Sequence, residues 1–146
     1  MLVASTGGHL AQLLNLAECW SGYERHWVTF DKPDAVVALQ NEVTTWAHHP
    51  TTRNIPNAMR NFLLAARTLR RVKPHLVVST GAGVALPFFL MAKLCRIRTV
   101  YIEVFDRIDR PTLTGRLCYP LSDAFCLQWE DQRSSYPDGV YVGPAW

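Results

Sequence analysis

The 146-residue sequence has no acidic residue between Arg53 and Arg98, although nine Lys and Arg residues occur in that stretch. The rest of the chain holds six Lys or Arg against twelve Asp and Glu. The formal net charge of +3 is therefore an average over a basic middle third and an acidic remainder. Such polarity favours an anionic partner, which means nucleic acid, anionic lipid, a phosphate-bearing substrate or an acidic protein. The alternative is that the cations only solvate the faces of ordinary helices.

Long hydrophobic runs are also absent. The longest, residues 82–92, covers eleven positions even with Gly83 and Pro87 included, whereas a spanning helix needs about 20. No basic segment precedes an apolar one at the start, so we expect no secretory signal peptide. With 49% hydrophobic and 18% charged residues the chain is not disordered, and its length predicts a single domain, 1–146.

Paired cysteines are missing as well. The four cysteines, at positions 19, 95, 118 and 126, form no CxxC pair. This spacing argues against a zinc site and against a disulfide framework. It predicts reduced, buried thiols.

Short apolar runs alternate with helical patterns along the chain. Strands are expected at residues 2–5, 25–30, 42–47, 75–79, 98–104, 124–128 and 140–142. Helices are expected at residues 10–17, from Pro33, from Asn54 or Asn57 to about Val72, at 84–94 and at 111–121. This alternation predicts an α/β fold, a Rossmann-like parallel sheet with helices on both faces.

In such a sheet, ligands bind beyond the carboxyl ends of the strands. Three segments fall there: residues 5–9 (STGGH), 79–83 (STGAG) and 103–110 (EVFDRIDR). Gly7 and Gly8 permit a sharp turn, and His9 follows at a helix N-terminus, where the dipole disfavours an imidazolium. His9 is then either a general base or a residue that caps the helix. The chain contains neither GxGxxG nor GxxxxGK[ST].

The other two segments leave alternatives open. The second glycine turn either offers N–H groups to an anion such as a pyrophosphate or is an ordinary strand–helix turn. Glu103 ends a predicted strand and is either catalytic or an organiser of neighbouring loops. Some of the charged residues after it form only surface ion pairs.

The helix at residues 84–94 combines apolar bulk with cations. Phe88 and Phe89 lie within it, and Lys93 and Arg96 come at its end. Together with Arg67, Arg70 and Arg71 of the preceding helix, they suit insertion at an anionic membrane surface. The alternative is a core helix of the sheet, and one helix can do both with different sides.

Taken jointly, several motifs resemble those of the bacterial PssD/CpsF-type proteins, which are relatives of the membrane-anchoring Alg subunit of the eukaryotic UDP-GlcNAc transferase. The motifs are STGGHL at 5–10, VSTGAG at 78–83, YIE at 101–103, LTGR at 113–116, YP at 119–120, Asp123, QW at 128–129 and YVG at 141–143.

This resemblance implies half of an enzyme, the N-terminal, acceptor-side Rossmann domain of a GT-B glycosyltransferase of the MurG kind. A PssE/CpsG-like donor-binding subunit would supply the other half, with a UDP-sugar as donor substrate and no cofactor. The acceptor would be a polyprenyl-diphosphate-linked saccharide at the cytoplasmic face of the cell membrane. The eukaryotic relatives have an N-terminal membrane span, and this sequence departs from them. The chain would therefore associate with the membrane peripherally or monotopically, without a transmembrane span, through the Phe88-Phe89 helix and the cations or through the partner.

The resemblance also implies roles for individual residues. His9 would deprotonate the acceptor hydroxyl for inverting transfer without a metal, and no DxD motif occurs. Glu103 would be a second base, a ligand of the acceptor hydroxyl or an organiser of the cleft. The residues implied to bind the acceptor diphosphate or substrate are Gly7, Gly8, Thr80, Gly81 and Gly83. Val104 departs from the family, which often has a small polar residue there.

Two other functions compete with this one. The chain could be a non-catalytic membrane recruiter or activator of a partner glycosyltransferase. Nucleic-acid binding is disfavoured, because no known motif occurs and aromatic residues do not alternate with the cations of the basic third.

Overall fold

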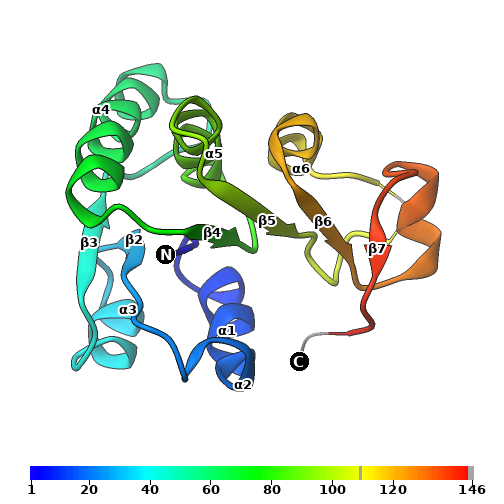
Figure 1. Ribbon diagram of the computed structural model, residues 1–146, viewed down its shortest axis with the longest axis horizontal. Helices are drawn as coiled ribbons and strands as arrows, with labels where there is room; N and C mark the ends of the chain where they lie inside the picture. Colours follow the sequence, from blue (N-terminus) through cyan, green and yellow to red (C-terminus); the bar gives the residue numbers. More distant parts are fainter. Residues whose placement is uncertain (109, 145–146) are drawn as a thin grey trace.

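The protein is a seven-stranded parallel sheet covered by helices on both faces (Figure 1). The computed structural model describes residues 1–108 and 110–144. The strands are β1 (Leu2–Val3), β2 (Trp27–Phe30), β3 (Thr44–Ala47), β4 (Leu76–Ser79), β5 (Arg98–Ile102), β6 (Ala124–Leu127) and β7 (Val140–Tyr141). Their order is β3-β2-β1-β4-β5-β6-β7, and every neighbouring pair is parallel. The predicted fold class is confirmed.

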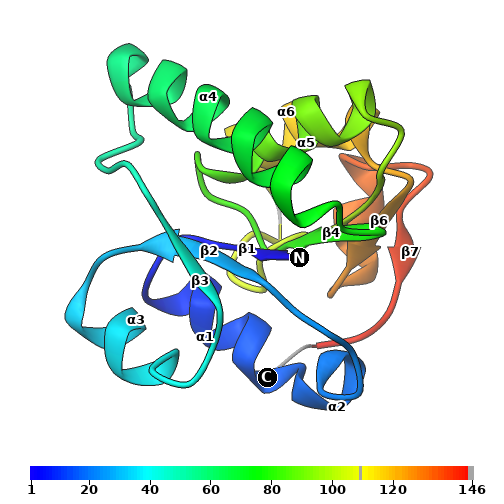
Figure 2. The same ribbon diagram turned by 60° about the vertical axis from the view of Figure 1, so that its left-hand side comes forward.

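Helices from the two halves of the chain cover opposite faces of the sheet (Figure 2). One face carries α1 (Gly8–Asn15), α2 (Ala17–Trp20) and α3 (Pro33–Ala38). The other carries α4 (Ile55–Val72), α5 (Ala85–Leu94) and α6 (Leu113–Cys118). Two 3-10 turns, η1 (Tyr119–Leu121) and η2 (Glu130–Ser134), flank β6.

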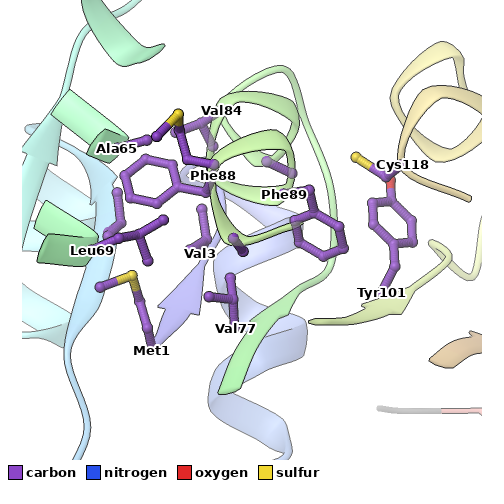
Figure 3. Packing of buried hydrophobic residues seen from close by; sticks show 14 of the residues in the cluster. Met1, Val3, Ala65, Leu69, Val77, Val84, Phe88, Phe89, Tyr101 and Cys118 are labelled. Carbon is purple, nitrogen blue, oxygen red and sulfur yellow. The ribbon is translucent and has the colours of Figure 1, made fainter. Parts of the chain in front are cut away.

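The two faces bury separate cores, because successive side chains of a strand point to opposite sides. Along β1, Leu2 packs with α1 and α3, whereas Val3 packs with α4 and α5. On the α4–α5 side, Phe88 and Phe89 are fully buried against Leu69 and Tyr101 (Figure 3). The expectation that Phe88 and Phe89 face a membrane is therefore wrong, since these rings fill the space between α5 and the sheet.

The long helix α4 is held at both ends. Asn54 is its N-cap, and its side chain accepts a hydrogen bond from the N–H of Asn57 at 2.9 Å. Lys73 ends the helix with a left-handed conformation, φ 50°. The buried side of α4 carries polar residues, because Asn57 and Asn61 point inward while Met59 is 59% exposed.

Most predicted elements are present with boundaries shifted by a few residues. The expected helix at 111–121 is divided into α6 and η1, where Pro120 lacks the N–H that a continued helix would use. The short segments α2 and η2 were not predicted, because four or five residues give no readable periodicity. Of the four cysteines, all free, only Cys118 is buried, and Cys19 and Cys95 are exposed, contrary to expectation.

No helix in the described ranges is both long and apolar enough to cross a bilayer.

Candidate functional site

A cleft of about 400 Å³ opens where the chain leaves neighbouring strands β1 and β4 in opposite directions. After β1 the chain enters α1 on one face, and after β4 it enters α5 on the other. Parallel α/β sheets bind ligands at such topological switch points. The lining of this switch-point cleft consists of Ser5, His9, Phe30, Pro50, Thr51, Thr52, Ala82, Gly83, Thr112 and Thr114.

His9 lies in the first turn of α1 and is locked to the end of β4. Its Nδ1 is 2.7 Å from the carbonyl oxygen of Thr80, and the Thr80 hydroxyl donates to the carbonyl of His9, also at 2.7 Å. Because a carbonyl oxygen only accepts, Nδ1 carries the proton in the neutral ring. The lone pair is therefore on Nε2, as a general base requires.

The second glycine turn shapes the cleft by its backbone. Gly81 has φ +110°, and a Cβ there would lie 2.6 Å from the Tyr101 hydroxyl and 3.3 Å from Cε1 of His9. Its N–H donates to the Ser79 hydroxyl at 2.9 Å. Thr80 is fully buried and binds His9, whereas Gly83 is exposed and lines the cleft. Of the predicted binding residues in this turn, only Gly83 is open to a ligand.

The first glycine turn already binds a carboxylate side chain of the protein itself. Gly7 has φ +70°, and its N–H donates to the carboxylate of Asp34 in α3 at 2.9 Å. Gly8 is exposed, with no atom within 4 Å of where a Cβ would stand. This Asp34 contact was not predicted, because no sequence signal relates residues 27 positions apart.

Glu103 lies beneath the cleft and is fully buried. Its carboxyl group accepts hydrogen bonds from the Tyr136 hydroxyl, from the N–H of Val104 at 3.0 Å and from the Thr112 hydroxyl at 3.2 Å. Burial raises the pKa of Glu103, and these hydrogen bonds partly lower it. Since the carboxyl group has no exposed surface, its position favours the organiser role over direct contact with a substrate.

The segment after Glu103 is fastened to β6 and η2. Gln128 donates to the Glu103 carbonyl at 2.7 Å, and Gln132 donates to the carbonyls of Val104 and Arg107 at 3.1 and 3.0 Å. Thr112 lines the cleft at the far end of this segment and contacts Glu103. Glu103 and the two glutamines therefore fix the wall that carries Thr112. Asp109 of the predicted segment lies outside the described residues.

The basic residues predicted for a membrane are exposed at the ends of two helices. Arg67, Arg70 and Arg71 lie in the last turns of α4, and Lys93 and Arg96 lie at the end of α5. Cations there also complement the negative end of the helix dipole. Exposed apolar residues of the same two helices are Ile55, Met59 and Leu63 on α4 and Leu90 and Leu94 on α5. We call these five residues the α4–α5 apolar surface.

The sequence did not predict the contribution of the loop before α4. Pro50, Thr51 and Thr52 line the cleft, although residues 48–54, which are polar and contain Pro50, indicate in the sequence only a loop between the strand at 42–47 and the next helix. Nothing in a single sequence shows that this loop returns to the switch point. In the described part of the chain, no group of three or more His, Cys, Asp or Glu side chains is placed to hold a metal ion.

Comparisons with known proteins agree with this architecture. The family described as "Oligosaccharide biosynthesis protein Alg14 like" matches residues 44–145. The UDP-N-acetylglucosamine transferase subunit ALG14 of Rattus norvegicus is 27% identical over 174 residues, covering 98% of this chain and 81% of that protein. The subunit of the same name from Eremothecium gossypii is 39% identical over 84 residues, covering 53% and 38%.

Solved structures share the fold at low identity. Acinetobacter baumannii MurG superposes with a TM-score of 0.76 at 19% identity and covers 99% of this chain. UDP-N-acetylglucosamine 2-epimerase from Rickettsia bellii superposes with a TM-score of 0.78 at 13% identity. The chain spans 46% and 44% of these two proteins, about half of their length. With a MurG-like Rossmann domain and a family match over more than two thirds of its residues, the chain belongs to the Alg14-like family of oligosaccharide biosynthesis proteins.

Proposed function

We propose that this protein is the acceptor-binding subunit of a two-chain inverting glycosyltransferase. The complex transfers a sugar from a UDP-sugar to a polyprenyl-diphosphate-linked saccharide in polysaccharide biosynthesis. The names of the relatives, UDP-N-acetylglucosamine transferase subunits, support the reaction class. The observation that carries the proposal is His9 at the switch-point cleft, with Nδ1 bound to Thr80 and Nε2 left as the base.

The proposed chemistry needs one base on this chain. His9 Nε2 accepts the proton of the acceptor hydroxyl while that oxygen attacks the anomeric carbon of the donor. The bond between the anomeric carbon and the UDP oxygen breaks, UDP leaves with the electron pair, and the configuration inverts. Binding of UDP is assigned to a PssE/CpsG-like donor-binding subunit, which the naming of the relatives as subunits of a transferase supports.

The lipid diphosphate is assigned to the second glycine turn. Gly83 is exposed at the cleft just before α5, whose positive dipole end favours phosphate. The diphosphate then lies on the side of the sheet that carries α4 and α5.

His9 is tested in the complex purified with its partner, assayed with UDP-sugars and a lipid-linked acceptor. His9→Gln lowers kcat by about 10²–10⁴-fold, the range for loss of a general base. His75→Gln is the matched control, because His75 is exposed at the opposite end of the sheet. Wild-type turnover by His9→Gln overturns the catalytic role, and full turnover by the isolated chain overturns the two-chain proposal.

Membrane association is assigned to the α4–α5 apolar surface in place of the buried Phe88 and Phe89. Ile55 and Met59 are 76% and 59% exposed, and the arginines of α4 follow along the same helix. Apolar side chains beside cations favour binding to an anionic bilayer surface. We expect Met59→Ser with Leu63→Ser to reduce co-sedimentation with anionic vesicles, and Val37→Ser on α3 to leave it unchanged.

The same surface favours a second candidate, a non-catalytic membrane recruiter or activator of a partner transferase. In that case His9→Ala leaves the complex fully active, whereas loss of the α4–α5 apolar surface releases it from membranes. The two candidates are therefore separated by the turnover of the His9 variants.

A further inference from the structure

We propose that residues 50–52, between β3 and α4, bind the acceptor sugar, with Thr51 and Thr52 as hydroxyl ligands of a neutral sugar ring. This inference rests on the proposed function and assigns a part of the cleft that neither glycine turn accounts for.

The chemistry of the cleft fits a neutral, hydroxyl-rich ligand. Five of its ten described lining residues carry hydroxyl groups: Ser5, Thr51, Thr52, Thr112 and Thr114. These described lining residues include no Lys, Arg, Asp or Glu. Hydroxyls both donate and accept, so they match sugar hydroxyls, whereas the carboxylate of a uronic acid would find no Lys or Arg among them. Phe30 and Pro50 add apolar surface for the C–H face of a ring.

The loop is held in place by buried amides of α4. Asn61 is fully buried, accepts from the N–H of His48 and donates to the carbonyl of His48, both at 2.8 Å. Asn57, 7% exposed, donates to the carbonyl of Pro50 at 3.0 Å. Two buried amide side chains thus hydrogen-bond to the backbone of one loop and fix its conformation. A loop that is already ordered loses less conformational entropy when it binds a ligand.

The loop also adjoins the turn assigned to the diphosphate. A Cβ at Gly83 would lie 2.9 Å from both Cβ and Oγ1 of Thr51. A sugar bound by Thr51 is thus next to a diphosphate at Gly83, as a sugar diphosphate requires. His9 lines the same cleft.

Binding is tested by NMR on the full chain with ¹³C-methyl threonine. The probes are N-acetylglucosamine and glucuronate, each linked to a short-chain prenyl diphosphate, and the prenyl diphosphate alone. We expect the Thr52 methyl signal to shift with the neutral sugar probe and to move little with the other two, whereas the Thr51 methyl, which adjoins Gly83, also responds to the diphosphate alone. Unshifted Thr51 and Thr52 signals, or equal affinity for the glucuronate probe, overturn the inference.

Substitution separates this inference from the proposed function. Thr51→Val and Thr52→Val each weaken binding of the neutral probe about 2- to 10-fold, the range for one lost neutral hydrogen bond. Thr44→Val is the control, because Thr44 lies at the far end of β3 and binds Glu42. In the complex, both variants raise the acceptor KM and leave the UDP-sugar KM unchanged. If both threonine variants transfer sugar with an unaltered acceptor KM, the sugar site is wrong and the proposed function stands. If the methyl signals shift but the wild-type complex transfers no sugar, the proposed function is wrong and the sugar site stands.

Discussion

The Glu103 carboxyl group is fully buried, where a charged carboxylate is costly unless it is hydrogen-bonded. Its partners are the hydroxyls of Tyr136 and Thr112 and the N–H of Val104. Burial nevertheless raises the pKa of Glu103 above its ordinary value of 4.5. The sequence could place Glu103 at a strand end, but it could not show that Tyr136, 33 residues later, would cover it.

This raised pKa has a consequence for stability. The folded state holds the Glu103 proton more tightly than the unfolded state does. Protonated Glu103 therefore adds to the unfolding free energy below about pH 4.5, and this stabilisation is lost as the pH rises through the pKa of the folded state. We expect the unfolding free energy of wild type minus that of Glu103→Gln to fall with rising pH, by at most about 1.4 kcal/mol per pH unit. Urea unfolding of both proteins from pH 4 to 8 measures it, and a difference that grows with pH contradicts the prediction.

Gly115 gives a prediction about packing. A Cβ there would overlap the Glu103 carboxyl group and the Tyr136 hydroxyl, and would lie 2.8 Å from Oγ1 of Thr112. We expect Gly115→Ala to lower the unfolding free energy by about 1–3 kcal/mol, the cost of overpacking a close-packed site. Gly22→Ala is the control, since no atom lies within 4 Å of its Cβ position. Equal stability of the two variants would contradict the prediction, because it would mean that Glu103, Tyr136 and Thr112 shift to make room for the added methyl group at no cost.

Thr80 gives a prediction about the His9 ring. Thr80→Val removes the hydroxyl that donates to the carbonyl of His9 while keeping the branched shape. We expect the Nδ1–H tautomer of His9 to lose population in ¹⁵N NMR, and kcat of the complex to fall about 10-fold because the base is less well held. Thr80→Ser restores both. An unchanged ring spectrum in Thr80→Val would show that the Thr80 carbonyl alone positions the ring.

At the scale of elements, α4 shows where sequence reasoning succeeded and failed. Its length was predicted, because a capping residue and Pro74 mark the two ends, and of the two predicted caps, Asn54 and Asn57, the structure has Asn54. Its apolar residues, at positions 59, 62, 63, 66 and 69, identify the buried side only in part, since Leu69 is buried but Met59 and Leu63 are exposed. Asn57 and Asn61 are buried instead. Buried asparagines are uncommon, and only the loop backbone that they bind explains them.

The amide of Asn61 is the basis of an element-scale prediction. Asn61→Ala leaves the N–H and carbonyl of His48 without this partner and opens a gap at a buried position, so we expect the unfolding free energy to fall by about 1–3 kcal/mol. Amide hydrogen exchange in residues 48–52 should accelerate more than exchange in β4. Asn15→Ala at the exposed end of α1 is the control. If amide hydrogen exchange accelerates equally over the whole chain, Asn61 stabilises the whole fold and does not specifically hold residues 48–52.

At the scale of the molecule, the alternation of apolar strands and helices predicted the sheet, and the sheet predicted that residues 5–9 and 79–83 meet. Both follow from rules that act along the chain or between neighbouring strands. Thr51 and Asp34 reach the site through loops and helix ends that no periodicity encodes. The membrane side inferred from the charges stays a prediction, and the two aromatic residues assigned to it, Phe88 and Phe89, are core residues.

The uneven charge gives a whole-molecule prediction. The proposed membrane association predicts that the exposed arginines near the end of α4 attract anionic lipid through screened charge interactions. We expect Arg67→Glu with Arg70→Glu and Arg71→Glu to abolish binding to anionic vesicles, and wild-type binding to weaken as salt rises from 50 to about 500 mM. Lys32→Glu with Arg133→Glu, both away from α4, serves as control. Equal losses in both sets would assign the effect to net charge alone.

The Asp34 carboxylate on the N–H of Gly7 makes the two glycine turns electrostatically unequal. At α1 the positive end of the dipole already has a counter-anion supplied by α3, so a phosphate arriving there meets a like charge before it meets a donor. At α5 no such carboxylate is among the described residues that line the cleft. For the proposed acceptor, this difference disfavours a diphosphate at the N-terminus of α1 and favours it at the turn before α5.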